Sequence, residues 1–225
     1  MTRCDWVPRI RTGSTQPGPV AYRRGVVTDD DGTTRQWPAV LTWRSQTSTQ
    51  MESARVQLVR GRIKAHGRIV AAATLDRPAF SASYDLVTDD NGATTRLSID
   101  VSLPERERQL SIARDEENMW LITDHEGSSR NAYGGAIDVD MALSPFFNAL
   151  PIRRLGLHQR AESVILPVVY VYLPELTITA ATISYSSPGP DSGDGIKVHS
   201  PVADTTVVVD DDGFIVDYPG LAERI

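Results

Sequence analysis

Residues Gly134–Leu157, GGAIDVDMALSPFFNALPIRRLGL, contain the features that decide the predicted fold. The stretch begins with a period-two pattern, because apolar residues from Ile137 to Met141 alternate with Asp138 and Asp140. Alternation of this kind is typical of a strand with one buried face. The segment therefore predicts a strand whose other face carries two carboxylates.

A short apolar helix is predicted directly after this strand. Ser144 is a favourable N-cap residue and Pro145 a favourable first helical residue. The apolar character of Pro145–Leu150 indicates that the helix packs inward, and Pro151 is expected to end it. The stretch is thus a strand followed by a helical plug.

The rest of the chain carries strand signals at intervals of about ten residues, as in an antiparallel meander. The clearest is Thr94–Leu103, where Leu97, Ile99 and Val101 alternate with polar residues. The other expected strands are Ala39–Trp43, Ala54–Val59, Arg62–Leu75, Ala79–Thr88, runs through Leu110 and Ile112 and through Trp120 and Ile122, Ser163–Leu173, Leu176–Ser187, Thr205–Val209 and Phe214–Tyr218. No segment except Pro145–Leu150 keeps a helical period, so the predicted class is all-β and mainly antiparallel.

Three turns share a run of acidic residues that ends in glycine: Asp29–Gly32, Asp89–Gly92 and Asp210–Gly213. A calcium loop needs ligands at alternate positions, a glycine at position six and a bidentate glutamate at position twelve, and none of the three has that set. Asp-Gly and Asn-Gly pairs favour tight hairpins. We therefore expect hairpin turns.

Composition limits the function classes. With 225 residues, 40% of them hydrophobic, the chain is long enough for one sizeable core. The net charge of −6 argues against nucleic-acid binding, which needs a cationic surface. The chain lacks an apolar run of roughly 20 residues that could span a bilayer and has no signal peptide pattern, and its single cysteine, Cys4, fits a reducing compartment. We therefore expect a cytoplasmic protein.

Residues 1–36 differ in composition from the remainder. They are rich in proline and glycine, show little periodicity and contain six arginines against four aspartates. We expect an irregular N-terminal leader, followed by a single β-barrel-like domain over residues 37–225. A basic arm that contacts an anionic headgroup or a membrane surface transiently is the functional alternative for the leader.

Two motifs carry a family resemblance. The run DVDMALSPFFNALPIRRL at Asp138–Leu155 and the later motif DYPGL at Asp217–Leu221 are similar to those of a family of small bacterial proteins known as Putative glycolipid-binding. The similarity extends over roughly residues 38–224. It implies a strongly curved antiparallel sheet that forms an open or half-closed β-barrel around an apolar cavity, with the helix as a plug.

The resemblance also implies a glycolipid or another amphipathic small molecule as the partner. Curved sheets can enclose acyl chains while polar groups at the mouth fix a headgroup, and aromatic faces pack against sugars and acyl chains alike. The guanidinium groups of Arg153 and Arg154 suit an anionic or sugar headgroup. The candidate ligand-binding residues are Asp138, Asp140, Phe146, Phe147, Asn148, Arg153, Arg154, Trp120, Tyr170 and Tyr218.

Each of these residues has a structural alternative. The aromatic residues could be ordinary core, and Asp138 and Asp140 could pair with Arg153 and Arg154 or stabilise the following helix. Two carboxylates about 6 to 7 Å apart on one strand face also suit a carbohydrate- or phosphate-active hydrolase. A third alternative is a structural or interaction domain without a cavity.

The sequence favours a binding protein over an enzyme. It has no Gly-x-Ser-x-Gly motif, its four histidines lack metal-ligand spacing, and the helices that an Asp-x-Asp phosphotransferase needs are missing. We expect no catalytic residue, no metal and no cofactor. The oligomeric state does not follow from the sequence.

Overall fold

The computed structural model describes residues 37–225, so the expected leader, Cys4 and the Asp29–Gly32 turn lie outside the described residues. The described residues form one fifteen-stranded sheet in the order β8-β7-β6-β5-β4-β3-β2-β1-β15-β14-β13-β12-β11-β10-β9. The strands are β1 (Ala39–Ser45), β2 (Gln50–Val59), β3 (Arg62–Ala71), β4 (Phe80–Thr88), β5 (Thr94–Ser102), β6 (Glu107–Arg114), β7 (Trp120–Asp124), β8 (Gly127–Asn131), β9 (Asp138–Met141), β10 (Ala161–Tyr172), β11 (Thr177–Pro188), β12 (Ile196–His199), β13 (Asp204–Val209), β14 (Ile215–Tyr218) and β15 (Ala222–Arg224).

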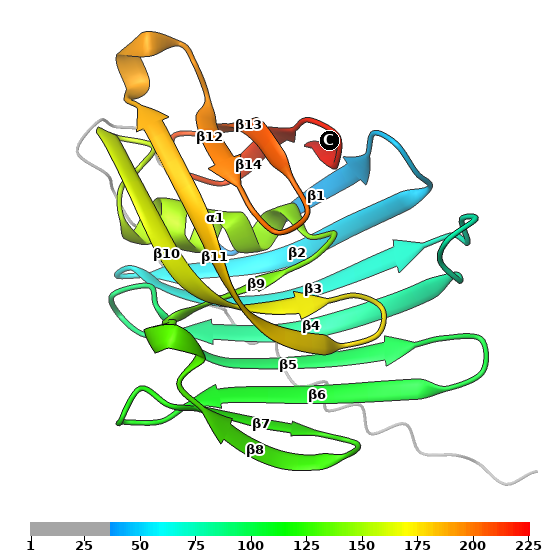
Figure 1. The fold of residues 1–225 in the computed structure, drawn as a ribbon. Helices are drawn as coiled ribbons and strands as arrows, with labels where there is room; N and C mark the ends of the chain where they lie inside the picture. Colours follow the sequence, from blue (N-terminus) through cyan, green and yellow to red (C-terminus); the bar gives the residue numbers. More distant parts are fainter. Residues whose placement is uncertain (1–36) are drawn as a thin grey trace, which may run out of the picture.

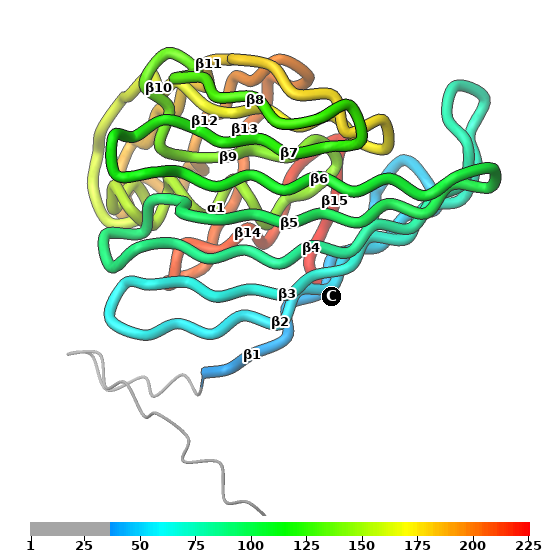
Figure 2. The backbone as a smooth tube through the Cα atoms, turned by 90° about the horizontal axis from the view of Figure 1, so that it is seen from below, coloured from blue at the N-terminus to red at the C-terminus, as the bar shows by residue number. Residues whose placement is uncertain are grey.

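The sheet curves strongly around a single α-helix, α1 (Pro145–Arg154), which is the one α-helix of residues 37–225. Strands β1–β8 form one wall, and β10–β13 lie on the opposite side of the helix (Figures 1 and 2). All strand pairs in the described part of the chain are antiparallel except β9 with β10. Hydrogen bonds do not join the end strands β8 and β9, so the prediction of an all-β, open or half-closed barrel with one helical plug is confirmed.

Alternation produces the strands where the sequence predicted them. In β5, Leu97, Ile99 and Val101 are buried, whereas Ser98 and Asp100 lie on the opposite face. The alternating pattern over Thr94–Leu103 therefore marks the concave, core-facing side correctly.

Three strands were not predicted. Every residue of β8 is exposed, so that strand has no apolar face to give a signal. Strand β15 has only three residues, too few for a periodic pattern. Strand β12 alternates buried Ile196 and Val198 with exposed Lys197 and His199, so here the prediction missed a short signal that was present. Pairing with neighbouring strands positions β8 and β15, whereas β12 also has a buried apolar face.

The acidic turns Asp89–Gly92 and Asp210–Gly213 are hairpin turns, as predicted. In both, Oδ1 of the first aspartate accepts hydrogen bonds from the backbone amides two and four residues later. The two glycines have φ angles of +84° and +77°, which residues with a Cβ rarely adopt. The turns join β4 to β5 and β13 to β14.

The prediction that Pro151 ends the helix is wrong, because α1 continues through Pro151 to Arg154. The proline lacks one backbone donor, but its own carbonyl accepts a hydrogen bond from the Leu155 amide at 3.0 Å. Ile152 is fully buried, so packing of the last turn stabilises the helix beyond the proline.

The prediction of a single buried face for β9 is also wrong, since all four of its residues are buried. Val139 and Met141 belong to the main apolar core. Asp138 and Asp140 alternate with them as expected, yet they too are covered, at 1% and 5% exposure. A strand at the end of the sheet is thus enclosed on both faces.

Candidate ligand-binding site

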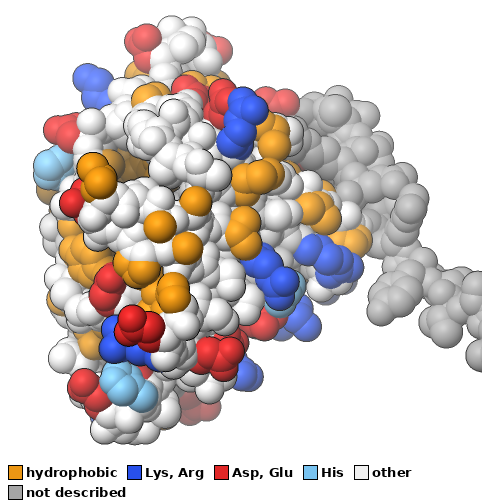
Figure 3. Space-filling view, turned by 90° about the vertical axis from the view of Figure 1, so that its right-hand side faces the viewer, with side chains coloured by type: hydrophobic (Ala, Val, Ile, Leu, Met, Phe, Trp, Pro, Cys, Tyr) orange, Lys and Arg blue, Asp and Glu red, His pale blue; other side chains and the backbone are white. Residues whose placement is uncertain are grey.

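The structure contains a cavity of about 550 Å³ that is open to solvent. Its walls come from the turn between β9 and α1, the end of β10, the β12–β13 loop and the β14–β15 turn, with Arg77 of the β3–β4 loop at the edge. The β3–β4 loop lies on the side of the molecule seen in Figure 3, where apolar side chains gather near the centre of the face. The volume is in the range of roughly 300–1,000 Å³ that small-molecule sites occupy.

Asp140 places a carboxyl group in this cavity. Its Oδ1 accepts a hydrogen bond from the Met141 amide at 2.8 Å. None of the ion pairs found within residues 37–225 includes Asp140. Burial is the main cause that raises the pKa of Asp140 to about 7; the Met141 amide opposes the shift, and the charge of Asp138 adds a smaller contribution to it. The group therefore titrates near neutral pH.

Tyrosines lie around this carboxyl group. Tyr170, Tyr172 and Tyr218 line the cavity, and the Tyr170 and Tyr172 rings meet edge to face with centroids 4.9 Å apart. Burial, followed by the charge of Asp140, raises the pKa of both Tyr170 and Tyr218 above the ordinary value. Their hydroxyls therefore stay protonated at neutral pH and can donate hydrogen bonds.

Asn148 adds an amide from the first half of α1. The Tyr185 hydroxyl donates a hydrogen bond to Asn148 Oδ1 at 3.1 Å, which fixes the orientation of the amide. Since Oδ1 is engaged in this way, the two N–H donors of Asn148 are the groups that remain for a ligand. The cavity thus combines a carboxyl acceptor, amide donors and tyrosine rings.

The wall at the start of α1 has an uncommon backbone conformation. Leu143 has a φ angle of +70°, a region that costs a residue with a side chain of order 1–3 kcal/mol. Its carbonyl oxygen accepts a hydrogen bond from Gln50 Nε2 at 2.9 Å, and Gln50 Oε1 accepts one from Arg77 Nη2 at 3.3 Å. Gln50 thereby connects this turn to the arginine at the edge of the cavity.

A buried glutamate lies behind the same wall. Glu52 is 2% exposed, and its Oε1 accepts hydrogen bonds from the Tyr84 hydroxyl at 2.6 Å and the Ser144 hydroxyl at 2.7 Å. Burial raises the pKa of Glu52 to about 7, while these two hydroxyls and the Phe146 amide oppose the shift. Ser144 stands at the N-cap position as predicted, but its side chain bonds to Glu52 and makes no capping bond.

The sequence prediction missed Glu52, although a signal was available. In β2, Gln50 and Glu52 lie on the same face as Ala54 and Val56, and that face is turned toward the core. Because residues at alternate positions of a strand share one face, the alternation with Ala54 and Val56 predicts that the Glu52 carboxyl group points into the core. Arg77 and the β12–β13 loop gave no such signal, because loops carry no periodicity.

Four of the ten predicted site residues line the cavity: Asp140, Asn148, Tyr170 and Tyr218. The other six do not, and each has a structural contact instead. Arg154 pairs with Asp138, with Nη2 and Oδ2 2.5 Å apart. The Arg153 guanidinium lies 4.5 Å from the Phe214 ring centroid.

The predicted aromatic residues outside the cavity are core residues. Phe146 and Phe147 are fully buried, and each ring contacts Tyr84. Trp120 is fully buried and donates its indole N–H to the Ala136 carbonyl at 2.8 Å. These rings fill the space between the sheet and the helix, so the cavity lies beside the plug rather than in the centre of the half-barrel.

Two further observations limit the chemistry within residues 37–225. No cluster of three or more histidine, cysteine or acidic side chains in that range could hold a metal ion. None of its helices has the length and apolar character needed to cross a membrane.

Comparisons with known proteins agree with this architecture. The chain is similar to the crystal structure, at 1.80 Å resolution, of a DUF1089 family protein from Pseudomonas aeruginosa. The two share 24% sequence identity with a TM-score of 0.62, over 81% of this chain and 95% of the other. At this identity the similarity concerns the fold. No curated protein is significantly similar to the chain.

The family assignment rests on the sequence itself. Residues 40–224, nearly all of the described chain, match the family described as "Putative glycolipid-binding". The match includes the Asp-x-Asp strand, the helical plug and the closing Asp-Tyr-Pro-Gly turn, on which the resemblance rested. The chain therefore belongs to this family.

Proposed function

We propose that the protein binds an amphipathic ligand, a glycolipid, in the cavity around Asp140. One observation carries the proposal: the buried carboxyl group of Asp140, which has no cationic partner within residues 37–225, lies in an open cavity among tyrosine rings and an amide. A carboxylate accepts hydrogen bonds from sugar hydroxyls without a charged partner, and aromatic rings pack against the apolar faces of sugars.

The apolar part of the ligand would lie against the apolar residues of the same cavity. Met141 and Leu173 are buried there, and Val202 is exposed on the β12–β13 loop. Each acyl methylene that leaves water contributes about 0.8 kcal/mol. Sequestration needs no catalytic group, and polar contacts with Asp140 and Asn148 would decide which headgroup fits.

The ion pair between Asp138 and Arg154 argues against a hydrolase that uses Asp138 with Asp140. A glycosidase needs both carboxyl groups beside the scissile bond. Asp138 is 1% exposed, bonds to Arg154 and does not line the cavity. We therefore assign no catalytic role to the Asp-x-Asp motif.

The test is native mass spectrometry of the full chain purified from its own host, together with organic extraction of any bound species. We expect a discrete added mass that extracts as a lipid. Asp140→Asn should reduce the bound fraction, whereas Asp100→Asn, which changes an exposed aspartate of β5, should leave it unchanged. An apo mass, with no uptake from a host lipid extract, would instead favour a structural or interaction domain.

A further inference from the structure

We propose that Arg77 anchors an anionic group of the ligand at the mouth of the cavity, so that the preferred ligand is an acidic glycolipid. This inference rests on the proposed function, because it names the class of ligand that the same cavity takes. It is argued from the position, the contacts and the charge environment of one side chain.

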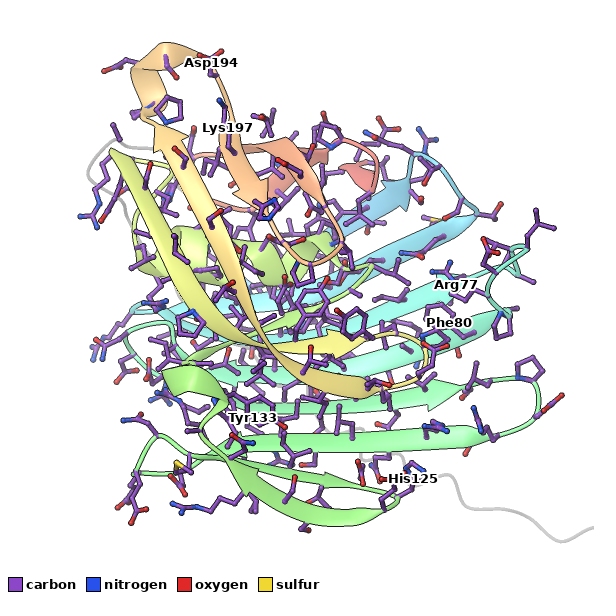
Figure 4. The ribbon with its side chains drawn as sticks, in the orientation of Figure 1. Arg77, Phe80, His125, Tyr133, Asp194 and Lys197 are labelled. Carbon is purple, nitrogen blue, oxygen red and sulfur yellow. The ribbon has the colours of Figure 1, made fainter. Side chains whose placement is uncertain are left out.

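The Arg77 guanidinium is held in place before any ligand binds. Its central carbon lies 5.1 Å from the centroid of the Phe80 ring, and the two side chains lie near each other where the β3–β4 loop enters β4 (Figure 4). Nη2 donates to Gln50 Oε1 at 3.3 Å, and Gln50 in turn bonds the Leu143 carbonyl. The planar group is therefore fixed relative to the cavity wall at little further entropic cost.

No carboxylate of the described residues forms an ion pair with Arg77. Within residues 37–225, no group accepts a hydrogen bond from its buried Nε–H. The negative charge of Glu175 acts on Arg77 from a distance. Because Glu175 is exposed, solvent screens this interaction. A partly buried guanidinium with a donor to spare is stabilised by an incoming anion.

Asp140 and Arg77 lie at different depths in the cavity. Asp140 is buried, whereas Arg77 is half-buried at the edge. The other carboxylate of the lining, Asp204, is exposed and lies 3.5 Å from His199. Sugar hydroxyls can therefore reach Asp140 while an acidic substituent, a carboxylate or a phosphate, remains at Arg77 and away from the deep carboxyl group.

A matched pair of lipids tests this assignment. Glucuronosyl diacylglycerol and glucosyl diacylglycerol with identical acyl chains differ only at C6 of the sugar, where the first has a carboxylate and the second a hydroxymethyl group. Their dissociation constants for the full chain can be measured by titration calorimetry in a neutral detergent. We expect about tenfold tighter binding of the acidic lipid, as for one charge-assisted hydrogen-bonded contact. The preference should shrink as the salt concentration rises.

Three variants separate an anion anchor from a structural role. Arg77→Gln should abolish the preference, because it should weaken binding of the acidic lipid about tenfold more than binding of the neutral lipid. Arg77→Lys should retain part of the preference. Arg96→Gln, which changes an exposed arginine of β5, should behave as the wild type.

Each remaining outcome is decisive. Equal wild-type affinities for the two lipids, with Asp140-dependent binding intact, would overturn the role of Arg77 and leave the proposed function standing. Equal loss of both affinities in Arg77→Gln would assign Arg77 to the wall instead. If neither lipid binds, the proposed function fails and this inference with it. If free glucuronic acid binds as tightly as the acidic lipid, the ligand is a soluble acid and not a glycolipid.

Discussion

The hydroxyl of Tyr84 donates a 2.6 Å hydrogen bond to Glu52 Oε1, between two strands that are not neighbours in the sheet. Ser144 donates to the same oxygen from the start of α1. The concave sheet and the helical plug are thereby joined at a buried, titratable carboxyl group. This contact fixes the turn that forms one wall of the cavity.

Glu52 should make stability depend on pH. Its pKa in the folded protein is about 7, against an ordinary value of 4.5, so protonation favours the folded state. The stabilisation is complete below pH 4.5 and is lost as pH rises through 7. Glu52→Gln keeps an acceptor for Tyr84, and it should reduce the loss in unfolding free energy between pH 5 and pH 8 by about 2–3 kcal/mol.

Urea unfolding at the two pH values measures this difference. Glu107→Gln, which changes an exposed glutamate of β6, is the matched control and should leave the pH dependence unchanged. The same pH dependence in the Glu52→Gln variant and the wild type would contradict the predicted titration.

Gly67 and Tyr84 give a second prediction. They are cross-strand partners in β3 and β4, and a Cβ at Gly67 would lie 2.1 Å from Tyr84 Cζ. Gly67→Ala must displace a ring that is held by Glu52, so we expect destabilisation by about 1–3 kcal/mol. In a double-mutant cycle, Gly67→Ala should cost much less in the Tyr84→Ala background. Additive costs, measured by urea unfolding, would show that the ring does not require the glycine.

The ion pair between Arg154 and Asp138 gives a third prediction. The Asp138 side chain is 2% exposed, and burial raises its pKa while Arg154 lowers it. Arg154→Met leaves that carboxyl group buried without its cation, so this substitution should lower the free energy of unfolding by about 3–5 kcal/mol. Adding Asp138→Asn should recover much of the loss. A double variant as unstable as the sum of the two single variants would exclude this coupling.

These contacts explain which parts of the fold the sequence could predict. The strand pattern of β5 and the hairpin turns Asp89–Gly92 and Asp210–Gly213 depend on neighbours in sequence, and these were predicted correctly. Asp138 and Asp140 share a strand face, so no local pattern distinguishes them. The position of Arg154 at the end of α1 makes the difference, because it forms an ion pair with Asp138 and not with Asp140, which lines the cavity.

The cavity itself could not be predicted from local patterns. Its lining combines residues of β9, β10 and α1 with the β3–β4 loop, the β12–β13 loop and the β14–β15 turn, segments that the curvature of the sheet brings together. The prediction of the helix length failed for a related reason, because the burial of Ile152 outweighs the local cost of Pro151. Tertiary packing decides both, and a single sequence does not contain that information in periodic form.

Ligand affinity should depend on the ionisation of Asp140, whose pKa in the ligand-free protein is about 7. Hydroxyls that donate to the carboxylate favour the ionised form, so the pKa falls on binding. By linkage, affinity for a neutral glycolipid should be highest above pH 7 and should weaken as pH falls below it. Because the neutral amide of an Asp140→Asn variant cannot titrate, that variant should bind weakly at every pH, whereas Asp100→Asn should follow the wild type. Titration calorimetry between pH 5 and pH 8 measures this dependence. Affinity that strengthens on acidification would mean that the protonated carboxyl group donates to the ligand, and equal affinity at every pH would remove Asp140 from the site.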